Sequence, residues 1–346
     1  MTPLLAEHQA RARAVLPADV YDYYASGAGD ETALSEAAAA WGVHRLLPSV
    51  LRDVGDVDLG VDLLGARLPS PVGVAPMAFH KLAHPDGEVE TMKGAGAGGH
   101  LMVVSTRASL PLEQIAAAAS GPWWFQVYVM RDRALTQALV ERAAEAGAQA
   151  LVLTGDTPYV GLKRRVSGVR FAVPEAEFLV NLAQHLADGA DAGAAAAQDP
   201  TVTSEAIAWL SRISGLPVLV KGVLRADDAV RCLDAGAAGI VVSNHGGRQL
   251  SRAVPTAQAL ARVAAAVGSR APVLVDGGLR SGMDVLVALA LGADAVLLGR
   301  PVLWALAAAS ATGVTSALED VDTELAHAMA LLGTTRCAAV DGTFLA

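Results

Sequence analysis

Eight short apolar runs, spread from residue 71 to residue 298, are the feature that most constrains how this chain can fold. Alanine-rich segments with helical spacing separate them, and several of these segments end in glycine, as at Gly147, Gly236 and Gly292. A helix, a glycine stop and a strand in repeated order predict a parallel sheet. Eight repeats favour a closed (β/α)8 TIM barrel over an open doubly wound sheet. The predicted strands are residues 71–75, 101–104, 123–128, 149–154, 217–220, 238–243, 272–275 and 294–298.

Two segments lie outside this pattern. The first 60 residues, in which helical patterns reach about residue 40, are expected to form an N-terminal helical segment. Residues 157–203 follow the fourth strand and are too many for an ordinary strand-to-helix loop. They contain a basic run, Lys163 to Arg165, and a tract rich in Ala, Gly and Asp at 187–199. We expect this segment to be a lid, and the chain from 1 to 346 to be one domain.

Composition excludes several classes of protein. Hydrophobic residues make up 53% and charged residues 18%, which suits a large core and not disorder. The net charge of −9 argues against nucleic acid or an anionic membrane as partner. Only two cysteines occur, so we expect no disulfide framework and a cytoplasmic location. Pro301 and Gly313 interrupt the longest uncharged run, so we expect no membrane span.

Candidate functional residues stand at the ends of the predicted strands, which is where TIM barrels place their active sites. The segment SNHGGRQL after the sixth strand combines His245, suited to be a general base, with Arg248, whose fork of donors matches a carboxylate. Alone, this motif is explained more simply by a histidine that caps a turn. The polar residues at other strand ends favour catalysis: Ser105, Thr106, Arg107, Gln126, Tyr128, Thr154, Asp156, Lys221, Ser243, Asn244, Asp276 and Arg300.

Glycine and arginine after the seventh and eighth strands predict a phosphate site. Backbone N–H groups beside glycine, with a helix N-terminus next to them, attract an anion. The residues are Asp276, Gly277, Gly278, Arg280, Gly299 and Arg300. A phosphate-bearing cofactor in a barrel would be FMN or pyridoxal phosphate, and Lys221 is the candidate for a Schiff base with the latter. We expect no metal.

The motifs SNHGGRQL, YDYYASGA, WFQVYV, LTGDTP, LPVLVKG, VLVDGGLRSG and LLGRPV resemble those of the FMN-dependent α-hydroxy acid oxidases and dehydrogenases. They occur in the same order from about Tyr21 to Leu332, and the segment GRPVLWALAAA is most similar to the 4-hydroxymandelate oxidases. This resemblance favours FMN over pyridoxal phosphate.

The resemblance implies a role for each matching residue. His245 would take a proton from the substrate and Asp156 would pair with its imidazole. Arg248 would bind the substrate carboxylate with help from the Tyr23 hydroxyl, and Tyr128 would hydrogen-bond the substrate oxygen. Lys221 would lie beside N1 and O2 of the flavin. The other implied cofactor contacts are Ala75, Pro76, Met77, Ala78, Ser105, Gln126, Thr154, Ser243 and the phosphate residues above.

Three positions depart from the family pattern. Lys163 stands where many members carry a second arginine in the lid, which reaches the substrate carboxylate or the base. Arg164 or Arg165 is an alternative for this role. Arg107 replaces an aromatic or small residue, which indicates either a second anionic group on the substrate or a surface salt bridge. Met77 replaces a small polar residue.

These observations lead to an enzyme that oxidises an (S)-2-hydroxy acid to a 2-oxo acid, with a mandelate-like acid favoured over lactate or glycolate. The alternative is an FMN-dependent tailoring oxidase that acts on an unusual or carrier-bound acid in secondary metabolism. An FMN-dependent isopentenyl diphosphate isomerase and a non-enzymatic flavin-binding scaffold agree less well with the residues. Oxygen or another acceptor would reoxidise the flavin, and we expect a homotetramer or larger assembly.

Overall fold

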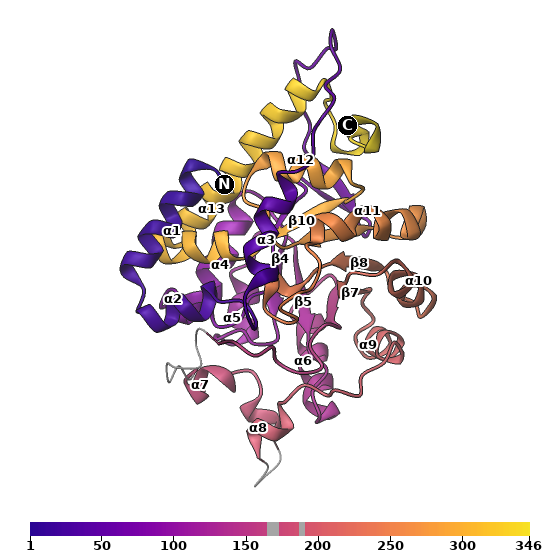
Figure 1. Ribbon diagram of the computed structural model, residues 1–346. Coiled ribbons are helices and arrows are strands. Elements are labelled where there is room, and N and C mark those ends of the chain that lie inside the picture. Colours follow the sequence, from indigo (N-terminus) through magenta and orange to yellow (C-terminus); the bar gives the residue numbers. More distant parts are fainter. Residues whose placement is uncertain (165–172, 187–190) are drawn as a thin grey trace.

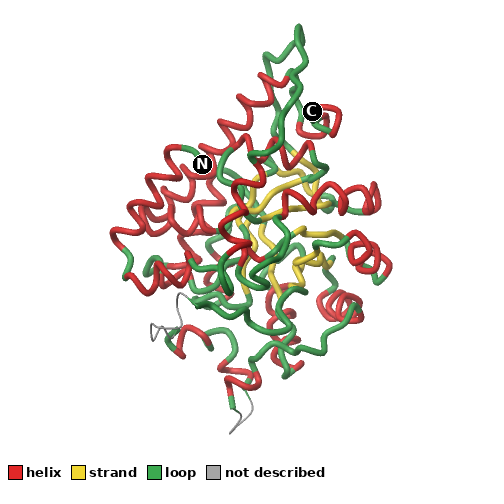
Figure 2. The backbone as a smooth tube through the Cα atoms, in the orientation of Figure 1, coloured by secondary structure: helices red, strands yellow, loops and turns green. Residues whose placement is uncertain are grey.

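The computed structural model describes residues 1–164, 173–186 and 191–346. Eight parallel strands close into a barrel in the order β10-β3-β4-β5-β6-β7-β8-β9, which confirms the predicted TIM barrel (Figures 1 and 2). The strands are β3 (Val72–Val74), β4 (Met102–Ser105), β5 (Trp123–Val127), β6 (Leu151–Thr154), β7 (Val218–Val223), β8 (Gly239–Val242), β9 (Val273–Asp276) and β10 (Ala295–Leu298).

Helices surround the barrel and run antiparallel to the strands they follow, as the connection of parallel strands requires (Figure 1). They are α4 (Gly87–Ala97), α5 (Leu112–Ala117), α6 (Arg133–Glu145), α9 (Glu205–Ser214), α10 (Ala226–Asp234), α11 (Thr256–Val267), α12 (Gly282–Ala290) and α13 (Arg300–Leu332). Short 3-10 turns are η1 (His80–Leu82), η2 (Ala183–His185), η3 (His245–Gly247), η4 (Gly268–Arg270), η5 (Cys337–Ala339) and η6 (Gly342–Phe344).

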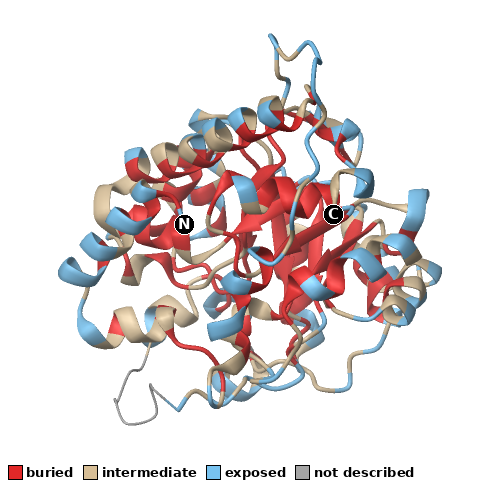
Figure 3. Ribbon diagram, turned by 45° about the horizontal axis from the view of Figure 1, so that its top comes forward, coloured by how far each residue is buried: buried red, intermediate tan, exposed pale blue. Residues whose placement is uncertain are grey.

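The core lies between the strands and the inner faces of these helices, where Figure 3 shows the buried residues concentrated. Every residue of β3, β4, β5, β6, β8, β9 and β10 is buried, as is usual for a parallel sheet covered on its faces. The near-continuous Val and Leu runs that predicted the strands are therefore explained by burial on both sides.

The N-terminal segment contains α1 (Pro3–Val15), α2 (Ala18–Ala25) and α3 (Thr32–Trp41). Its helical part ends at Trp41, which confirms the predicted limit of about residue 40. A hairpin of β1 (Val61–Leu63) and β2 (Ala66–Leu68) precedes the barrel and was not predicted. Three-residue strands carry too little alternation to be detected from the sequence. Figure 1 shows α1 beside α13 on one flank of the barrel.

In the predicted lid, the structure describes two short helices, α7 (Glu175–Phe178) and α8 (Ala192–Ala195). They lie together at one end of the barrel in Figure 1. A backbone bridge between Met130 and Gln198, and the hydrogen bond from Arg131 N to Ala197 O (2.8 Å), attach the end of this segment to the residues that follow β5. Arg165 lies outside the described residues.

α13 is long and apolar enough to cross a membrane, by length and composition alone. However, 56% of its most apolar window is buried inside the structure. It also bends at Ala309 and Ser310, where the backbone leaves the helical conformation. These features are those of a helix that packs in the core of the protein.

Candidate active site

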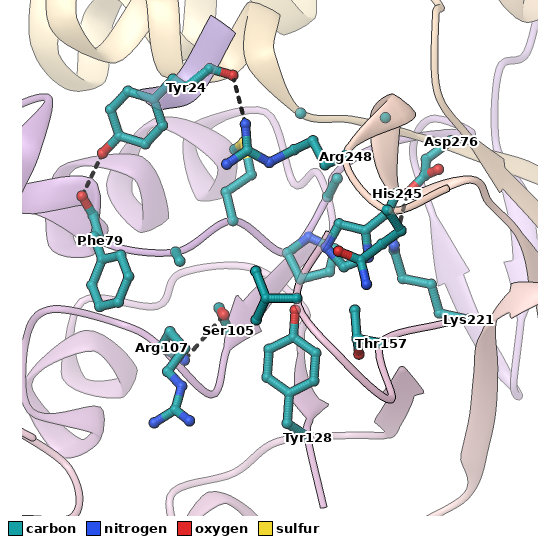
Figure 4. A pocket seen from close by; sticks show the side chains of 18 of the residues that line it. Tyr24, Phe79, Ser105, Arg107, Tyr128, Thr157, Lys221, His245, Arg248 and Asp276 are labelled. Carbon is teal, nitrogen blue, oxygen red and sulfur yellow. Dashed lines mark hydrogen bonds and ion pairs between the residues drawn. The ribbon is translucent and has the colours of Figure 1, made fainter. Parts of the chain in front are cut away.

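A cavity of about 550 Å³ opens at the carboxyl ends of the barrel strands (Figure 4). Most of the residues singled out in the sequence line it, although they come from segments up to 277 residues apart. These are Tyr23, Ala75, Pro76, Met77, Ala78, Ser105, Arg107, Tyr128, Lys163, Lys221, His245, Arg248, Asp276, Gly277, Gly278, Arg280, Gly299 and Arg300.

His245 and Asp156 form a pair at the edge of this cavity. The imidazole Nδ1 lies 3.1 Å from Asp156 Oδ1, so the carboxylate holds a proton on Nδ1 and leaves the lone pair of Nε2 available. Burial, followed by the positive charge of Lys221, lowers the pKa of His245 below its ordinary value even though Asp156 acts in the opposite direction. The imidazole is therefore neutral at pH 7 and suited to accept a proton.

Asp156 is held as a carboxylate by the same pair. Its burial alone would raise its pKa, but the facing His245 and then Lys221 outweigh burial and keep the pKa below the ordinary value. Gln249 supports the strand end by donating from Nε2 to the Asp156 carbonyl oxygen at 3.0 Å. Gln249 belongs to the same SNHGGRQL motif as His245. The motif therefore supplies the histidine and also positions Asp156, the carboxylate that pairs with it.

The backbone of the SNHGG segment is strained at the histidine. His245 has φ +57°, and Gly246 and Gly247 follow with φ +61° and +74°. Only glycine adopts this left-handed conformation without cost, so the strain is concentrated at His245. Asn244 stabilises the turn by accepting a hydrogen bond from Gly247 N at 3.2 Å. The turn directs the His245 ring into the cavity, as Figure 4 shows.

Arg248 is anchored by the C-terminal end of α2. Its Nη1 donates to the carbonyl oxygens of Tyr23 (2.8 Å), Tyr24 (3.1 Å) and Ser26 (2.9 Å), which are orphan carbonyls at a helix end. The guanidinium carbon lies 5.2 Å from the centre of the Tyr23 ring. Burial raises the pKa of Tyr23 and Arg248 partly offsets this, so its hydroxyl stays protonated and can donate a hydrogen bond. The N-terminal segment therefore positions the predicted carboxylate-binding pair.

Tyr128 directly follows β5, and the Thr106 hydroxyl oxygen accepts a hydrogen bond from its backbone N–H at 3.0 Å. Burial raises the pKa of the Tyr128 phenol above its ordinary value, and the charge of Asp156 adds to the shift. The phenol is thus a neutral hydrogen-bond donor. In Figure 4 it lies near the middle of the cavity.

Lys163 lies in the cavity wall, as predicted for the second cation of the lid. Its Nζ donates to Gly161 O at 3.3 Å. Burial, and then the positive charge of Arg248, lower its pKa to about 8. Arg107 is also in the wall, at the end of β4, and it is buried with 8% of its surface exposed. The alternative of a surface salt bridge for Arg107 is therefore wrong.

Lys221 lies inside β7, close to its end, and its ammonium group is held by two neighbours. Nζ donates to Ser243 Oγ at 2.9 Å and lies 3.3 Å from Asp276 Oδ2. The other oxygen of Asp276, Oδ1, is buried and has no hydrogen-bond partner among the described residues. An unpaired buried acceptor beside a cavity indicates a donor on a bound molecule.

The opposite end of the cavity is a cradle of glycine and arginine. Gly277 and Gly278 have φ +90° and +88°, a conformation that only glycine adopts readily. A Cβ atom on Gly278 would lie 2.3 Å from the Ala37 carbonyl oxygen of α3, so the loop can pass only as glycine. Arg300 begins α13, and its Nε and Nη1 donate to Tyr24 O (2.9 Å) and Gly246 O (3.0 Å).

These residues match the requirements of FMN. Gly277, Gly278, Arg280, Arg300 and the N-terminus of the 33-residue α13 supply the donors and positive charge that a phosphate needs. Residues 75–78 form an uncharged wall, and the Lys221 ammonium faces the same space, where it can balance negative charge on a reduced flavin ring. The unpaired Asp276 Oδ1 can accept from a hydroxyl of the ribityl chain.

Three predicted cofactor contacts do not line the cavity but lie behind its wall. The Gln126 side chain belongs to a row of hydrogen bonds: it accepts one from Ser105 Oγ (3.1 Å) and donates one to Thr154 Oγ1 (2.9 Å). Ser243 Oγ accepts hydrogen bonds from Lys221 Nζ and from the backbone N–H of His245, the latter at 3.0 Å. These side chains orient the wall residues, and their direct contact with the cofactor stays a prediction.

The sequence did not single out several residues that line the cavity. Phe79 and Phe178 form an aromatic wall, with ring centres 6.4 Å apart, and Thr157 and Gln198 line the cavity as well. Phe79 also stands in the left-handed conformation, with φ +60°, and its carbonyl oxygen accepts from the Tyr24 hydroxyl at 2.5 Å. A bulky residue with this backbone cannot be recognised from sequence spacing.

Comparison with known proteins agrees with this geometry. Residues 12–346 match the family model of FMN-dependent dehydrogenases. The chain is 42% identical to L-lactate oxidase of a Nostoc species, over 99% of this chain and 97% of that one. It is 44% identical to 4-hydroxymandelate oxidase of Amycolatopsis orientalis, over 95% and 94% of the two chains. Glycolate oxidase 1 of Oryza sativa is 42% identical, over 96% and 92%.

Solved structures match along the same length. The crystal structure of a mandelate oxidase superposes with a TM-score of 0.91 at 42% identity and covers 99% of this chain and 97% of that chain. The barrel, the cradle for FMN and the His245–Asp156 pair thus occur in a chain whose relatives share its whole length, and the chain belongs to the FMN-dependent dehydrogenase family of oxidoreductases.

Proposed function

We propose that the protein oxidises an (S)-2-hydroxy acid to the 2-oxo acid, and that mandelate-like acids are better substrates than lactate or glycolate. The observation that carries this proposal is the placement of the His245–Asp156 pair and Arg248 in one cavity with the FMN cradle. Relatives named as oxidases of lactate, 4-hydroxymandelate and glycolate support the class of substrate. The aromatic wall of Phe79 and Phe178 supports an aryl side chain.

The residues divide the work of the reaction. The substrate carboxylate pairs with Arg248, next to the Tyr23 hydroxyl, and the Tyr128 phenol donates to the substrate oxygen. This orientation brings the carbon that bears the hydroxyl group toward His245. His245 Nε2 accepts one proton, either from the α-carbon or from the hydroxyl group, and Asp156 stabilises the imidazolium that forms. FMN supplies the acceptor for the two electrons and the second hydrogen that the substrate loses.

The test is anaerobic bleaching of the flavin. The yellow holoenzyme is mixed, without oxygen, with (S)-mandelate, (R)-mandelate, (S)-lactate or glycolate, and flavin absorbance is followed in a stopped-flow instrument. We expect rapid bleaching by the (S)-acids, fastest with (S)-mandelate, and its loss in His245→Ala. Faster bleaching by (R)-mandelate would contradict the proposed stereochemistry, and bleaching by none of the acids would contradict the proposed reaction.

The same experiment addresses the electron acceptor. We infer that oxygen is the acceptor, since the relatives above are named as oxidases. Admission of air to the bleached enzyme would then restore the yellow colour within seconds and release hydrogen peroxide. Colour that returns only when a quinone or an artificial dye is added would assign the enzyme to dehydrogenases.

We also infer a homotetramer or larger assembly in the cytoplasm. The support for assembly is a group of exposed apolar side chains before the barrel: Val43, Leu47, Val50 and Leu51 are 54–102% exposed. The support for a reducing compartment is that Cys232 and Cys337 are both free. Light scattering of the purified protein, and fractionation of cells that express it, would test the two inferences.

A further inference from the structure

Arg107 is the buried cation that the proposed reaction does not use. It follows β4 in the cavity wall, and its Nη2 donates to the carbonyl oxygen of Ala196. Its Nη1 is buried and has no hydrogen-bond partner among the described residues. No carboxylate in the described part of the chain lies within salt-bridge distance of it, whereas several arginines at the surface, such as Arg67, Arg133 and Arg142, have such a partner. A guanidinium in this state is costly to bury and calls for an anion.

Among the described residues, none of those around Arg107 carries a charge that would neutralise it. Its guanidinium carbon lies 4.3 Å from the centre of the Phe178 ring. Burial lowers its pKa to about 10, and the two side chains that act in the opposite direction, Tyr128 and then Tyr23, are both neutral phenols at pH 7. Arg107 therefore remains positively charged in an aromatic environment at neutral pH.

Arg107 and the carboxylate-binding arginine occupy different parts of the cavity. In Figure 4, Arg107 lies next to Ser105 and Tyr128, whereas Arg248 lies next to Tyr24 and His245. The cavity wall also contains Arg131 and Lys163. Asp276 is the only carboxylate among the described lining residues, and it faces Lys221. The substrate half of the cavity thus has more positive charge than the single carboxylate of a simple 2-hydroxy acid can balance.

We propose that Arg107 binds a second anionic group of the substrate, a carboxylate at the end remote from the one that Arg248 holds. The preferred substrate is then a dianionic 2-hydroxy acid. This inference rests on the proposed function and narrows its substrate class. Either an aliphatic or an aryl spacer can join the two carboxylates, and the experiment distinguishes them.

A purely structural role for Arg107 has different consequences. Through Phe178 of α7 and Ala196, which directly follows α8, Arg107 contacts the 157–203 segment at two places, so it also holds that segment against β4. If this were its only role, loss of the guanidinium would impair all substrates alike. Recognition of a second carboxylate instead changes the selectivity between a dianionic acid and a monoanionic acid of the same size.

The test compares matched pairs of acids in anaerobic flavin reduction. The aliphatic pair is (S)-2-hydroxyglutarate and (S)-2-hydroxyvalerate, and the aryl pair is (S)-4-carboxymandelate and (S)-4-methylmandelate. We expect the wild-type holoenzyme to favour the dianionic member of at least one pair in the ratio of reduction rate constant to Kd. In Arg107→Met we expect this ratio of dianion to monoanion to fall about 100-fold, the size typical of a lost buried charge pair.

Two variants serve as controls. Arg107→Lys keeps the charge without the fork and should retain part of the selectivity, and it also covers the event that Arg107→Met fails to fold. Arg212→Met removes an exposed cation of α9 that does not line the cavity, and it should change the selectivity less than about threefold. Equal losses with both members of a pair in Arg107→Met, or a wild-type preference for the monoanions, would overturn the proposal.

A binding measurement separates this inference from the proposed reaction. Perturbation of the oxidised flavin spectrum by 2-oxoglutarate and by 2-oxovalerate gives a Kd for each without turnover. We expect tighter binding of the dianion, lost in Arg107→Met. If no hydroxy acid bleaches the flavin but this difference in Kd is found, the proposed reaction fails and the anion site at Arg107 stands. Equal Kd values within this pair and also within the aryl pair, 4-carboxyphenylglyoxylate and 4-methylphenylglyoxylate, would refute the site even if the reaction is confirmed.

Discussion

At the scale of single residues, His245 combines backbone strain with a side chain that must act as a base. Replacement by Gln removes the base and keeps the size, so the rate constant of flavin reduction should fall by about 10²- to 10⁴-fold. FMN content should stay unchanged, since the imidazole is not part of the FMN cradle. Stopped-flow reduction and the flavin absorbance per protein would show this, and a loss of less than about tenfold would contradict the role of His245.

The pKa of His245 gives this prediction a pH dependence. Burial, and then Lys221, place the pKa below the ordinary value of about 6.5, so the reactive neutral form dominates at pH 7. The reduction rate should be constant above that pH and should fall about tenfold per pH unit on the acid side of the pKa. In Asp156→Asn the imidazole loses a charge that raises its pKa, so the acid limb should move to lower pH while the plateau rate decreases. A limb that moves to higher pH would exclude the pairing seen here.

Lys163 predicts a second pH effect, on the alkaline side. Its pKa of about 8, caused by burial and by Arg248, means that the side chain is charged at pH 7 and becomes neutral above pH 8. If this charge assists Arg248 with the substrate carboxylate, KM should rise as the pH increases from 7 to 9. Lys163→Met should have a high KM at pH 7 and little change up to pH 9. Lys93→Met, at an exposed lysine of α4, is the matched control and should behave as wild type.

The residues that carry distinctive chemistry could be predicted, because a histidine, arginine or lysine directly after a predicted strand is recognised from the sequence alone. It could not identify their surroundings. Whether Arg107 is paired at the surface or buried depends on Phe178 and Ala196, which are 71 and 89 residues away in the chain and come close only in the fold. The position of Gln126 and Thr154 at strand ends is apparent from the sequence, but the hydrogen bond between them is not.

At the scale of elements, the loop between β9 and α12 decides whether the phosphate end of the cavity can form. Gly278→Ala would place a Cβ atom 2.3 Å from Ala37 O and at φ +88°, so α3 or the loop must move. We expect FMN binding to weaken by at least about tenfold, and a loss of stability above the cost of about 1 to 2 kcal/mol for an alanine in the left-handed region. Trp41, whose Nε1 donates to Gly277 O at 2.9 Å, provides a fluorescence signal for the displaced loop.

Gly147 is the matched control for this prediction. It ends α6 with φ +96°, and a Cβ atom added there would have no neighbouring atom within 4 Å, so Gly147→Ala carries the backbone cost without the steric clash. Urea unfolding should show only the left-handed penalty in Gly147→Ala and a larger loss in Gly278→Ala, and FMN titration should be affected in Gly278→Ala alone. Equal FMN affinity in the two variants would contradict the role of the tight approach between this loop and α3.

The alternation of strands and helices could be predicted because apolar strand runs and helical segments recur in the same order, with glycine at the ends of several helices. Boundaries were less accurate where the tertiary structure intervenes. β7 extends to Val223, beyond the predicted end at residue 220, because an irregularity between Lys221 and Val223 lets it continue beside β8. Lys221 therefore points into the barrel mouth from within a strand and not from a loop. No local sequence feature marks that irregularity.

At the scale of the whole molecule, the cavity is assembled from residues of α2, β4, β7, β9 and β10 and from the segments that follow β3, β5, β6 and β8, so it exists only when the barrel is closed. A ligand that binds the closed barrel and not the unfolded chain must stabilise the entire fold. The chain has a net charge of −9, but cations are concentrated around the cavity and the remainder of the molecule carries the negative charge. An anion is therefore attracted to the cavity and not to the rest of the surface. Selectivity for an anionic cofactor and substrate is thus a property of the folded chain.

FMN should therefore raise the melting temperature of the apoprotein in proportion to the logarithm of its concentration. At about 100 times Kd the stabilisation is about 2.7 kcal/mol, which for a chain of this length corresponds to about 4 °C. Arg300→Met should shift this dependence to higher FMN concentrations, since the loss of a cation from the phosphate site raises Kd, whereas Arg131→Met, at the rim of the same cavity, should leave it in place. Calorimetry of the apoprotein over a range of FMN concentrations measures the shift directly. Coincident curves for wild type and Arg300→Met would mean that the phosphate is bound elsewhere, because a contact that contributes to binding must also contribute to the stability that binding confers at a given FMN concentration.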